Sequence, residues 1–214
     1  MLAGCSGASG GQTATDPSQT PSTTATAPAQ ALAALATKAA STDFGGTYVL
    51  DSIDPKRPDG TTRVYKKGPL YRVDVDLNGS SSRLITTNAG AVSCQIAPKK
   101  WSCLLVAKPG QSLPRLFDPG IQRIFTTTLQ AVASGGNDLA VTANGTLPAT
   151  DTLPVAQCFG VSGPGVDPGE YCLTDTGLVR RAQFPSGTLT LQSYSFGVPA
   201  RSFVPPTRPT PLPG

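Results

Sequence analysis

The sequence predicts a mainly β domain with a helical insertion, which places it in the α+β class. Short apolar segments, separated by turns rich in Gly, Pro, Asn and Asp, follow one another along the middle of the 214-residue chain. One stretch inside this region instead carries apolar residues at helical spacing. Four of the five cysteines also flank two short loops in pairs, as expected for bridged hairpins.

Composition divides the chain into three parts. Residues 1–28 are dominated by Ser, Thr, Gly, Ala, Gln and Pro and predict a disordered tether with a reach of roughly 25–30 Å. Residues 29–206 hold the regular apolar pattern of a single domain. Residues 207–214 predict a Pro-rich, polyproline-like tail.

The chain begins with Leu2-Ala3-Gly4-Cys5, which resembles the lipobox of bacterial lipoproteins. The resemblance implies that Cys5 carries lipid and anchors the protein to the cell membrane on its extracytoplasmic face. The charged and apolar parts of a signal peptide do not precede the motif, so we expect a truncated signal peptide and a start site further upstream. The alternative is a lone exposed cysteine in a tail. No segment approaches the ~18 apolar residues of a membrane-spanning helix.

The first half of the domain predicts a leading helix and a series of strands. Pro28 suits a first helical turn, and the Ala- and Leu-rich run after it predicts a helix over 28–40. Asp59-Gly60 and Asn78-Gly79 are hairpin turn signals. Strands are expected over residues 47–53, 73–77, 83–87, 91–96 and 101–106.

The pattern then changes from strand to helix and back. Asp118-Pro119 predicts a helix start, the apolar residues from Ile121 to Val132 share one helical face, and Gly135-Gly136 ends the helix. Asn144-Gly145 is interpreted as another hairpin turn. Further strands are expected over residues 139–143, 155–161, 170–174, 178–184 and 188–196, for roughly eleven in total.

The cysteine spacing predicts two disulfides. If the turn after Ala97 is centred between Pro98 and Lys99, Cys94 and Cys103 form a non-hydrogen-bonded pair, with Cα atoms about 4.5 Å apart.

Cys158 and Cys172 likewise flank a Gly- and Pro-rich loop. Each bridge would contribute roughly 3 kcal/mol and implies an oxidising compartment. The alternative, a zinc site, lacks Cys-x-x-Cys spacing and histidine, so no metal is expected.

The commonest general base and the best-known catalytic motifs are missing from the sequence. The chain has no histidine, no Ser-x-x-Lys, no Gly-x-Ser-x-Gly elbow and no phosphate-binding Gly-rich loop, so we expect neither an enzyme nor a cofactor. The net charge of +4 is carried by scattered residues, which argues against nucleic acid.

One partial metal motif runs from Asp74 to Gly79 and matches the first half of a calcium loop. Position 12 of that loop would be Ile85 instead of an acid, so we favour a strand that enters an Asn-Gly turn.

The order of elements resembles the outer-membrane lipoprotein carrier (LolA-like) superfamily, and in particular its lipid-anchored actinobacterial relatives. The local resemblance lies in the segments Gly169-Glu170-Tyr171-Cys172-Leu173-Thr174-Asp175-Thr176-Gly177-Leu178-Val179 and Val198-Pro199-Ala200-Arg201-Ser202-Phe203-Val204-Pro205-Pro206. It extends over residues 29–206 and implies a strongly curved antiparallel half-barrel with helices over its open side. In that family the cavity holds acyl chains or other apolar ligands.

Two functional hypotheses follow. The first is an envelope lipoprotein that binds or carries a lipid or other hydrophobic ligand as a monomer. The second is a structural or interaction lipoprotein with a filled core and protein partners. In the first hypothesis the cavity lid is formed by Leu116, Phe117, Ile121, Ile124, Phe125, Leu129 and Val132.

Overall fold

The computed structural model describes residues 26–53, 59–97, 99–117, 120–135 and 138–212. The leading helix is α1 (Ala27–Ser41). The helical insertion consists of η1 (Arg115–Phe117), α2 (Ile121–Arg123), the π-helical η2 (Ile124–Thr128) and α3 (Leu129–Ala133), and a further short turn, η3 (Ala200–Phe203), lies near the C-terminus. The strands are β1 (Phe44–Ser52), β2 (Gly60–Lys67), β3 (Leu70–Leu77), β4 (Ser80–Thr87), β5 (Gly90–Ala97), β6 (Lys100–Ala107), β7 (Ala140–Leu147), β8 (Ala156–Ser162), β9 (Gly169–Thr174), β10 (Val179–Phe184), β11 (Gly187–Phe196) and β12 (Thr210–Pro211).

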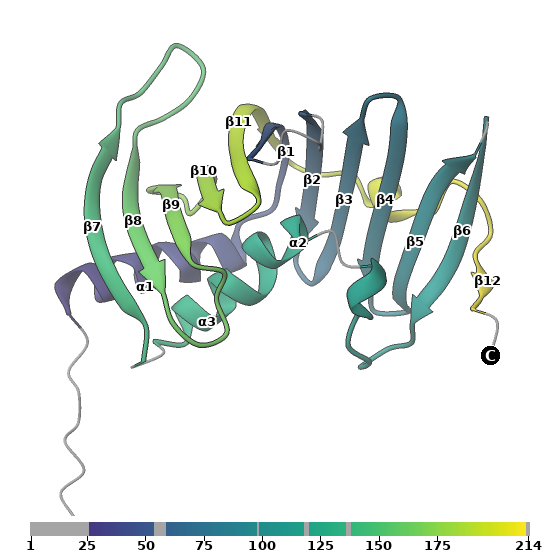
Figure 1. Cartoon of the computed structure of the whole chain (residues 1–214), viewed down its shortest axis with the longest axis horizontal. Coiled ribbons are helices and arrows are strands. Elements are labelled where there is room, and N and C mark those ends of the chain that lie inside the picture. The colour runs from purple at the N-terminus through teal and green to yellow at the C-terminus, as the bar shows by residue number, and fades with distance from the viewer. Residues whose placement is uncertain (1–25, 54–58, 98, 118–119, 136–137, 213–214) are drawn as a thin grey trace, which may run out of the picture.

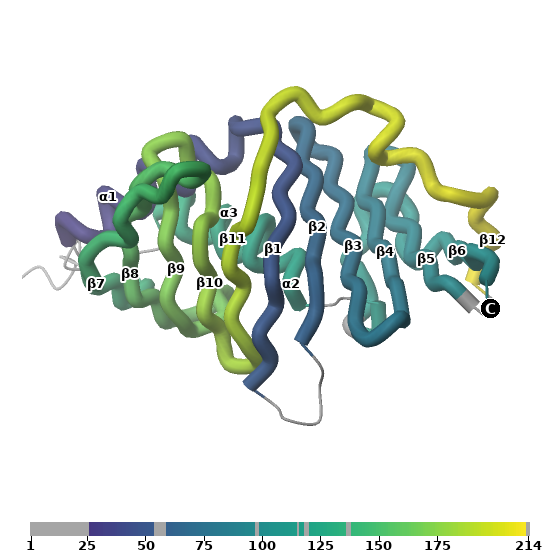
Figure 2. The backbone as a smooth tube through the Cα atoms, turned by 90° about the horizontal axis from the view of Figure 1, so that it is seen from above, coloured from purple at the N-terminus to yellow at the C-terminus, as the bar shows by residue number. Residues whose placement is uncertain are grey.

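These strands, all within the described residues, form one sheet in the order β12-β6-β5-β4-β3-β2-β1-β11-β10-β9-β8-β7. Neighbours are antiparallel except β12, which lies parallel to β6. The sheet is open and curved, and α1, α2 and α3 lie against one face of it (Figures 1 and 2). We call the face that the helices cover the inner face and the opposite face the outer face.

The helices cover the sheet unequally. They pack on β1 and β7–β11, where the inner face is filled by side chains that are at most 1 % exposed: Tyr48, Tyr171, Leu173, Leu189 and Leu191. We call this part the filled half. The inner face of β2–β6 has less helix above it (Figure 1), and we call this part the open half.

The part of the insertion that follows η1 begins later than the sequence predicts. It starts at Ile121, after Gly120 with φ of 76°, and Gly135 with φ of 64° follows its end. The predicted start at Asp118-Pro119 and the stop residue Gly136 lie outside the described residues. Its middle turn is π-helical, a form that is rare and occurs mostly as single turns within α-helices.

The two disulfides join directly opposed residues on neighbouring strands. Cys94 faces Cys103 across β5 and β6, with Cα atoms 4.1 Å apart, in the register that the turn geometry predicts. Cys158 faces Cys172 across β8 and β9, with Cα atoms 4.0 Å apart. Pro98 itself lies outside the described residues.

The two Asn-Gly pairs behave differently. Asn78 and Gly79 have φ of 45° and 81° and turn β3 into β4, as predicted. The prediction of a turn at Asn144-Gly145 is wrong, because both residues lie inside β7. There the pairing with β8 shifts between Ala143 and Thr146, so the pair forms a bulge.

The C-terminal segment returns across the sheet instead of leaving it. Val198 and Phe203 pack on Ile85 at the outer face, and Arg72 donates a hydrogen bond from Nη1 to the carbonyl oxygen of Ser202 (2.9 Å). The segment then reaches the edge of β6 as β12 (Figure 2). Part of the region predicted as a separate tail, residues 207–214, therefore belongs to the sheet.

Candidate functional site

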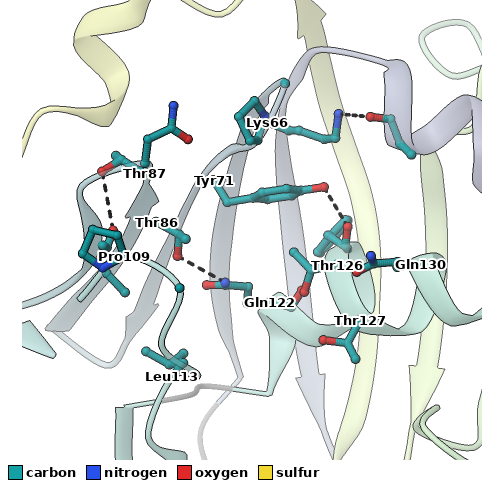
Figure 3. A pocket seen from close by; sticks show the side chains of 18 of the residues that line it. Lys66, Tyr71, Thr86, Thr87, Pro109, Leu113, Gln122, Thr126, Thr127 and Gln130 are labelled. Atoms are coloured by element: carbon teal, nitrogen blue, oxygen red, sulfur yellow. Dashed lines mark hydrogen bonds between the residues drawn. The ribbon is translucent and has the colours of Figure 1, made fainter. Parts of the chain in front are cut away.

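A cavity of about 1060 Å³ lies between the inner face of the open half and the helical insertion (Figure 3). The turns after β2 and β4 and the loop after β6 surround it. Its walls combine polar and apolar side chains, which include Lys66, Tyr71, Thr86, Thr87, Ala91, Lys108, Pro109, Leu113, Gln122, Phe125, Thr126, Leu129, Gln130 and Ala133.

The floor of the cavity is a row of residues that runs across the strands. Lys66 on β2 lies opposite Tyr71 on β3, Tyr71 opposite Thr86 on β4, and Thr86 opposite Ala91 on β5. Ala91 in turn lies opposite Ala107 on β6. Because adjacent strands are about 4.8 Å apart, the part of the row that lines the cavity, from Lys66 to Ala91, spans roughly 14 Å and changes from an ammonium group to a methyl group.

Lys66 stands at the polar end of this row and is only 2 % exposed. Its Nζ donates hydrogen bonds to the carbonyl oxygens of Ala40 (2.7 Å) and Thr42 (3.1 Å), at the C-terminal end of α1. The ammonium thus satisfies carbonyl groups that the helix leaves unpaired. Burial lowers the pKa of Lys66, and the nearby Asp43 acts in the opposite direction.

The roof is formed by the helical insertion. Tyr71 donates a hydrogen bond from Oη to the carbonyl oxygen of Phe125 (2.8 Å), which fixes the helix above the floor. Burial raises the pKa of Tyr71 well above its usual range. Gln122 donates from Nε2 to Oγ1 of Thr86 (3.4 Å), and Figure 3 shows both contacts crossing the cavity. The Gln122 Oε1 atom is buried and has no hydrogen-bond partner among the described residues.

The predicted lid residues fall into three groups. Ile121, Ile124 and Val132 are at most 4 % exposed and belong to the main core, but they do not line the cavity. Phe125 and Leu129 lie at the boundary, since they pack in the same core and also contact the cavity. The apolar face of the helical insertion packs against the filled half. The cavity is therefore lined by an adjacent side of the helix, which carries Gln122, Thr126 and Gln130.

The other two predicted lid residues belong to η1. Leu116 is 87 % exposed and does not line the main cavity, for which it was predicted to form part of the lid. Phe117 packs with Leu84 and Leu113 in a small apolar cluster at the inner face. That cluster lies between the main cavity and a cleft of about 210 Å³, which both η1 residues line.

The remaining predicted sites are outside the cavity. Cys5 lies outside the described residues. The sulfur atoms of Cys158 and Cys172, which lie near the Glu170 carboxylate, are joined to each other and so are not free to bind a metal. In the partial calcium motif, Asp74 is paired with Arg72 and Arg83 on the neighbouring positions of the outer face.

Sequence reasoning missed most of the cavity. It placed no strand over residues 60–67, so Lys66 was not considered, and Tyr71 fell outside the predicted strand 73–77. The only local signal was the Asp59-Gly60 turn, after which a strand had to follow. Nothing in the local pattern indicates that Lys66, Tyr71, Thr86 and Ala91 align, because strand pairing sets that row.

No helix within the described residues is long and apolar enough to cross a membrane. No protein-family model matches the chain, and no curated protein matches its sequence.

Solved structures do share its architecture. An uncharacterized conserved protein from Thermus thermophilus matches with 12% identity and a TM-score of 0.54, over 86% of this chain and 98% of that chain. A chain of the Pseudomonas aeruginosa MucA/MucB complex matches with 15% identity and a TM-score of 0.50, over 82% and 59%. LprF from Mycobacterium bovis matches with 14% identity and a TM-score of 0.49, over 85% and 97%. The prediction of one curved antiparallel sheet covered by helices is confirmed (Figure 1).

Proposed function

We propose that this protein is a non-enzymatic lipoprotein of the cell envelope that binds a lipid or similar amphiphile in the cavity of the open half. The observation that carries the proposal is the cavity of about 1060 Å³ on the inner face, beside a core that is otherwise closely filled. Its volume lies at the upper end of the ~300–1,000 Å³ typical of small-molecule sites.

The lining supports an amphiphile over a purely apolar ligand. Phe125, Leu129, Leu113 and Ala91 provide apolar surface, and removal of acyl chain surface from water there gives roughly 25 cal/mol per Å². Polar groups such as Gln122 stand on the same walls and would be left unsatisfied by a ligand without hydrogen-bonding atoms.

The envelope location is inferred from two independent features. The cross-strand disulfides Cys94–Cys103 and Cys158–Cys172 fit an oxidising compartment. The Leu2-Ala3-Gly4-Cys5 motif implies a lipid anchor at Cys5, with the domain held off the membrane by the tether.

The test is native mass spectrometry of the protein after gentle extraction, compared between two tryptophan variants. Thr86→Trp fills space at the cavity floor on β4. Thr61→Trp is the control, because Thr61 lies on the outer face of β2, away from the cavity. We expect co-purified lipid with the parent protein and with Thr61→Trp, and much less with Thr86→Trp. Absence of lipid from all three, together with failure to take up added lipid, would reject the binding function.

The second hypothesis, an interaction protein with protein partners, has one observation in its favour. The fold is shared with a chain of the MucA/MucB complex, in which that protein assembles with another. If the parent protein binds no lipid and instead co-purifies with a protein in stoichiometric amount, this hypothesis replaces the first.

A further inference from the structure

We infer that the ligand is an anionic amphiphile, whose negative group lies at Lys66 and whose chain runs along the floor row towards Ala91 and Leu113. This inference rests on the proposed function and specifies the chemistry of its ligand. It concerns both the charge of the ligand and the direction in which it lies.

The charged side chains that line the cavity are of one sign. Among the described lining residues the charged side chains are Lys66 and Lys108, and there is no Asp or Glu. A cavity whose lining charges are cationic favours an anion, because low-dielectric walls concentrate the field of these charges.

Lys66 is the better placed of the two cations. It lies on the cavity floor and is 2 % exposed, whereas Lys108 is exposed at the rim near the apolar end. An ammonium group has three N–H donors, and the hydrogen bonds to Ala40 and Thr42 use two of them. One donor therefore remains for a ligand oxygen.

The charge of Lys66 is not fully compensated by the protein. Its hydrogen-bond acceptors are neutral carbonyl groups, and the Tyr71 ring lies 5.9 Å from Nζ. Asp43 is the acidic group that acts on it, and the Asp43 carboxylate accepts a hydrogen bond from the backbone N–H of Gly68 (2.7 Å). Burial lowers the pKa of Lys66 more than Asp43 raises it, which means that burial destabilises the charged ammonium. An anionic ligand group beside Nζ would stabilise that charge.

The opposite end of the row suits an acyl chain. Ala91 on the floor packs in one apolar cluster with Leu84, Val106 and Ala107, and Leu113, which also lines the cavity, packs against that cluster. A chain that runs from Lys66 over Tyr71 and Thr86 thus reaches this apolar cluster, while Lys108 stays at the exposed rim. A ligand in the reverse direction would place its charge near Lys108, whose exposure to water weakens the attraction between the two charges.

The experiment compares two ligands that share one chain length. Binding of palmitate and of hexadecanol to the full protein is measured by competition with a fluorescent fatty-acid analogue. We expect palmitate to bind at least ten-fold more tightly than hexadecanol. Acetate, which carries the anion without a chain, should not displace the analogue, and displacement by acetate would indicate a simple anion site instead.

Three variants test the direction of the ligand. Lys66→Met should reduce the preference for palmitate to less than three-fold, whereas Lys66→Arg, which keeps the charge, should retain most of it. Lys108→Met is the matched control at the other end and should keep the full preference. Loss of preference in Lys108→Met with retention in Lys66→Met would overturn the assigned direction.

Because Lys66 also binds the end of α1, Lys66→Met can fail to fold. The deciding measurement in that case is NMR of the unmutated protein with labelled lysine. Palmitate should shift the Lys66 ε-methylene resonances more than those of Lys108, and hexadecanol should do so much less. Equal affinity for both ligands would overturn this inference and leave the proposed function intact, whereas binding of neither ligand would reject the proposed function itself.

Discussion

The filled half and the open half belong to one continuous sheet but differ in what covers their inner face (Figure 1). In the filled half, α1 and the insertion cover β1 and β7–β11, and side chains such as Leu173 and Leu189 are completely buried. In the open half, the insertion covers the inner face of β2–β5 only along its flank, and a cavity of about 1060 Å³ remains. The cavity therefore exists because the helices are too few and too short to cover the whole sheet.

The comparison also shows that one short helical segment can have two functions. Its apolar stripe, with Ile124 and Phe125, completes the core of the filled half. Its flank, with Gln122 and Thr126, forms the roof of the cavity. Neighbouring residues of the insertion should therefore respond very differently to the same substitution.

The largest expected effect comes from a charge placed on either side of this helix. Phe125 is 3 % exposed, and its ring centroid lies 5.3 Å from that of Tyr48 and 6.2 Å from that of Phe44. Phe125→Asp buries an unpaired carboxylate and should destabilise the domain by more than about 4 kcal/mol. Thr126→Asp, on the cavity side, should cost about 1 kcal/mol or less, as measured by urea unfolding. Similar losses of stability in the two variants would show that the two sides of this helix do not face a filled core and an open cavity.

The second effect is the loss of a large apolar side chain in each half. Leu173 has no exposed surface and packs in the main core, so Leu173→Ala should cost about 2–5 kcal/mol through lost contacts and a new void. Leu113 is half-buried at the cavity, so Leu113→Ala should cost about 1 kcal/mol while it reduces lipid uptake. Thermal and urea unfolding of both variants provide the comparison. A loss above about 3 kcal/mol for Leu113→Ala would show that the open half is packed as tightly as the other.

The third effect should be equal in the two halves. Cys94–Cys103 closes a separation of 9 residues in the open half, and Cys158–Cys172 one of 14 in the filled half. The chain-entropy account gives about 3 kcal/mol for each bridge, since loop length enters only logarithmically. Paired Cys→Ala variants, compared by urea unfolding, should lose nearly the same stability. A much larger loss in one half would show that native contacts, and not the unfolded chain, decide the contribution.

The smallest expected effect is on the pH dependence of stability. Burial raises the pKa of Tyr171, in the filled half, to about 12, with a further contribution from Asp167. A raised pKa means that the stability associated with the neutral phenol is complete below the ordinary value of about 10 and is lost as the pH rises through 12. Tyr171→Phe should therefore reduce the fall in stability between about pH 10 and 12, as measured by urea unfolding at each pH.

The accompanying optical titration tests the same point. The near-ultraviolet phenolate absorbance of the parent protein should show at least one tyrosine that ionises only at about pH 12, and Tyr171→Phe should remove that late step. A titration in which Tyr171 ionises at the ordinary value of about 10 would contradict its burial in the filled half.

The sequence by itself determined many, though not all, of the local elements of this protein. Period-two alternation and Asn-Gly chemistry located β3 and its turn at Asn78-Gly79, because both depend on residues adjacent in the chain. The spacing of Cys94 and Cys103 predicted the register of β5 and β6, because a tight turn leaves few ways to pair the strands that it joins. The helical stripe from Ile121 to Val132 was visible for the same reason.

Only the tertiary structure decided what that stripe faces. A helical pattern shows that one face is apolar, but it does not show whether a sheet, a second helix or a cavity lies opposite, because those partners come from distant parts of the chain. The row from Lys66 to Ala91 likewise exists only after β2, β3, β4 and β5 have paired. The cavity is the space left between a curved sheet and a short helix, and no residue encodes it locally.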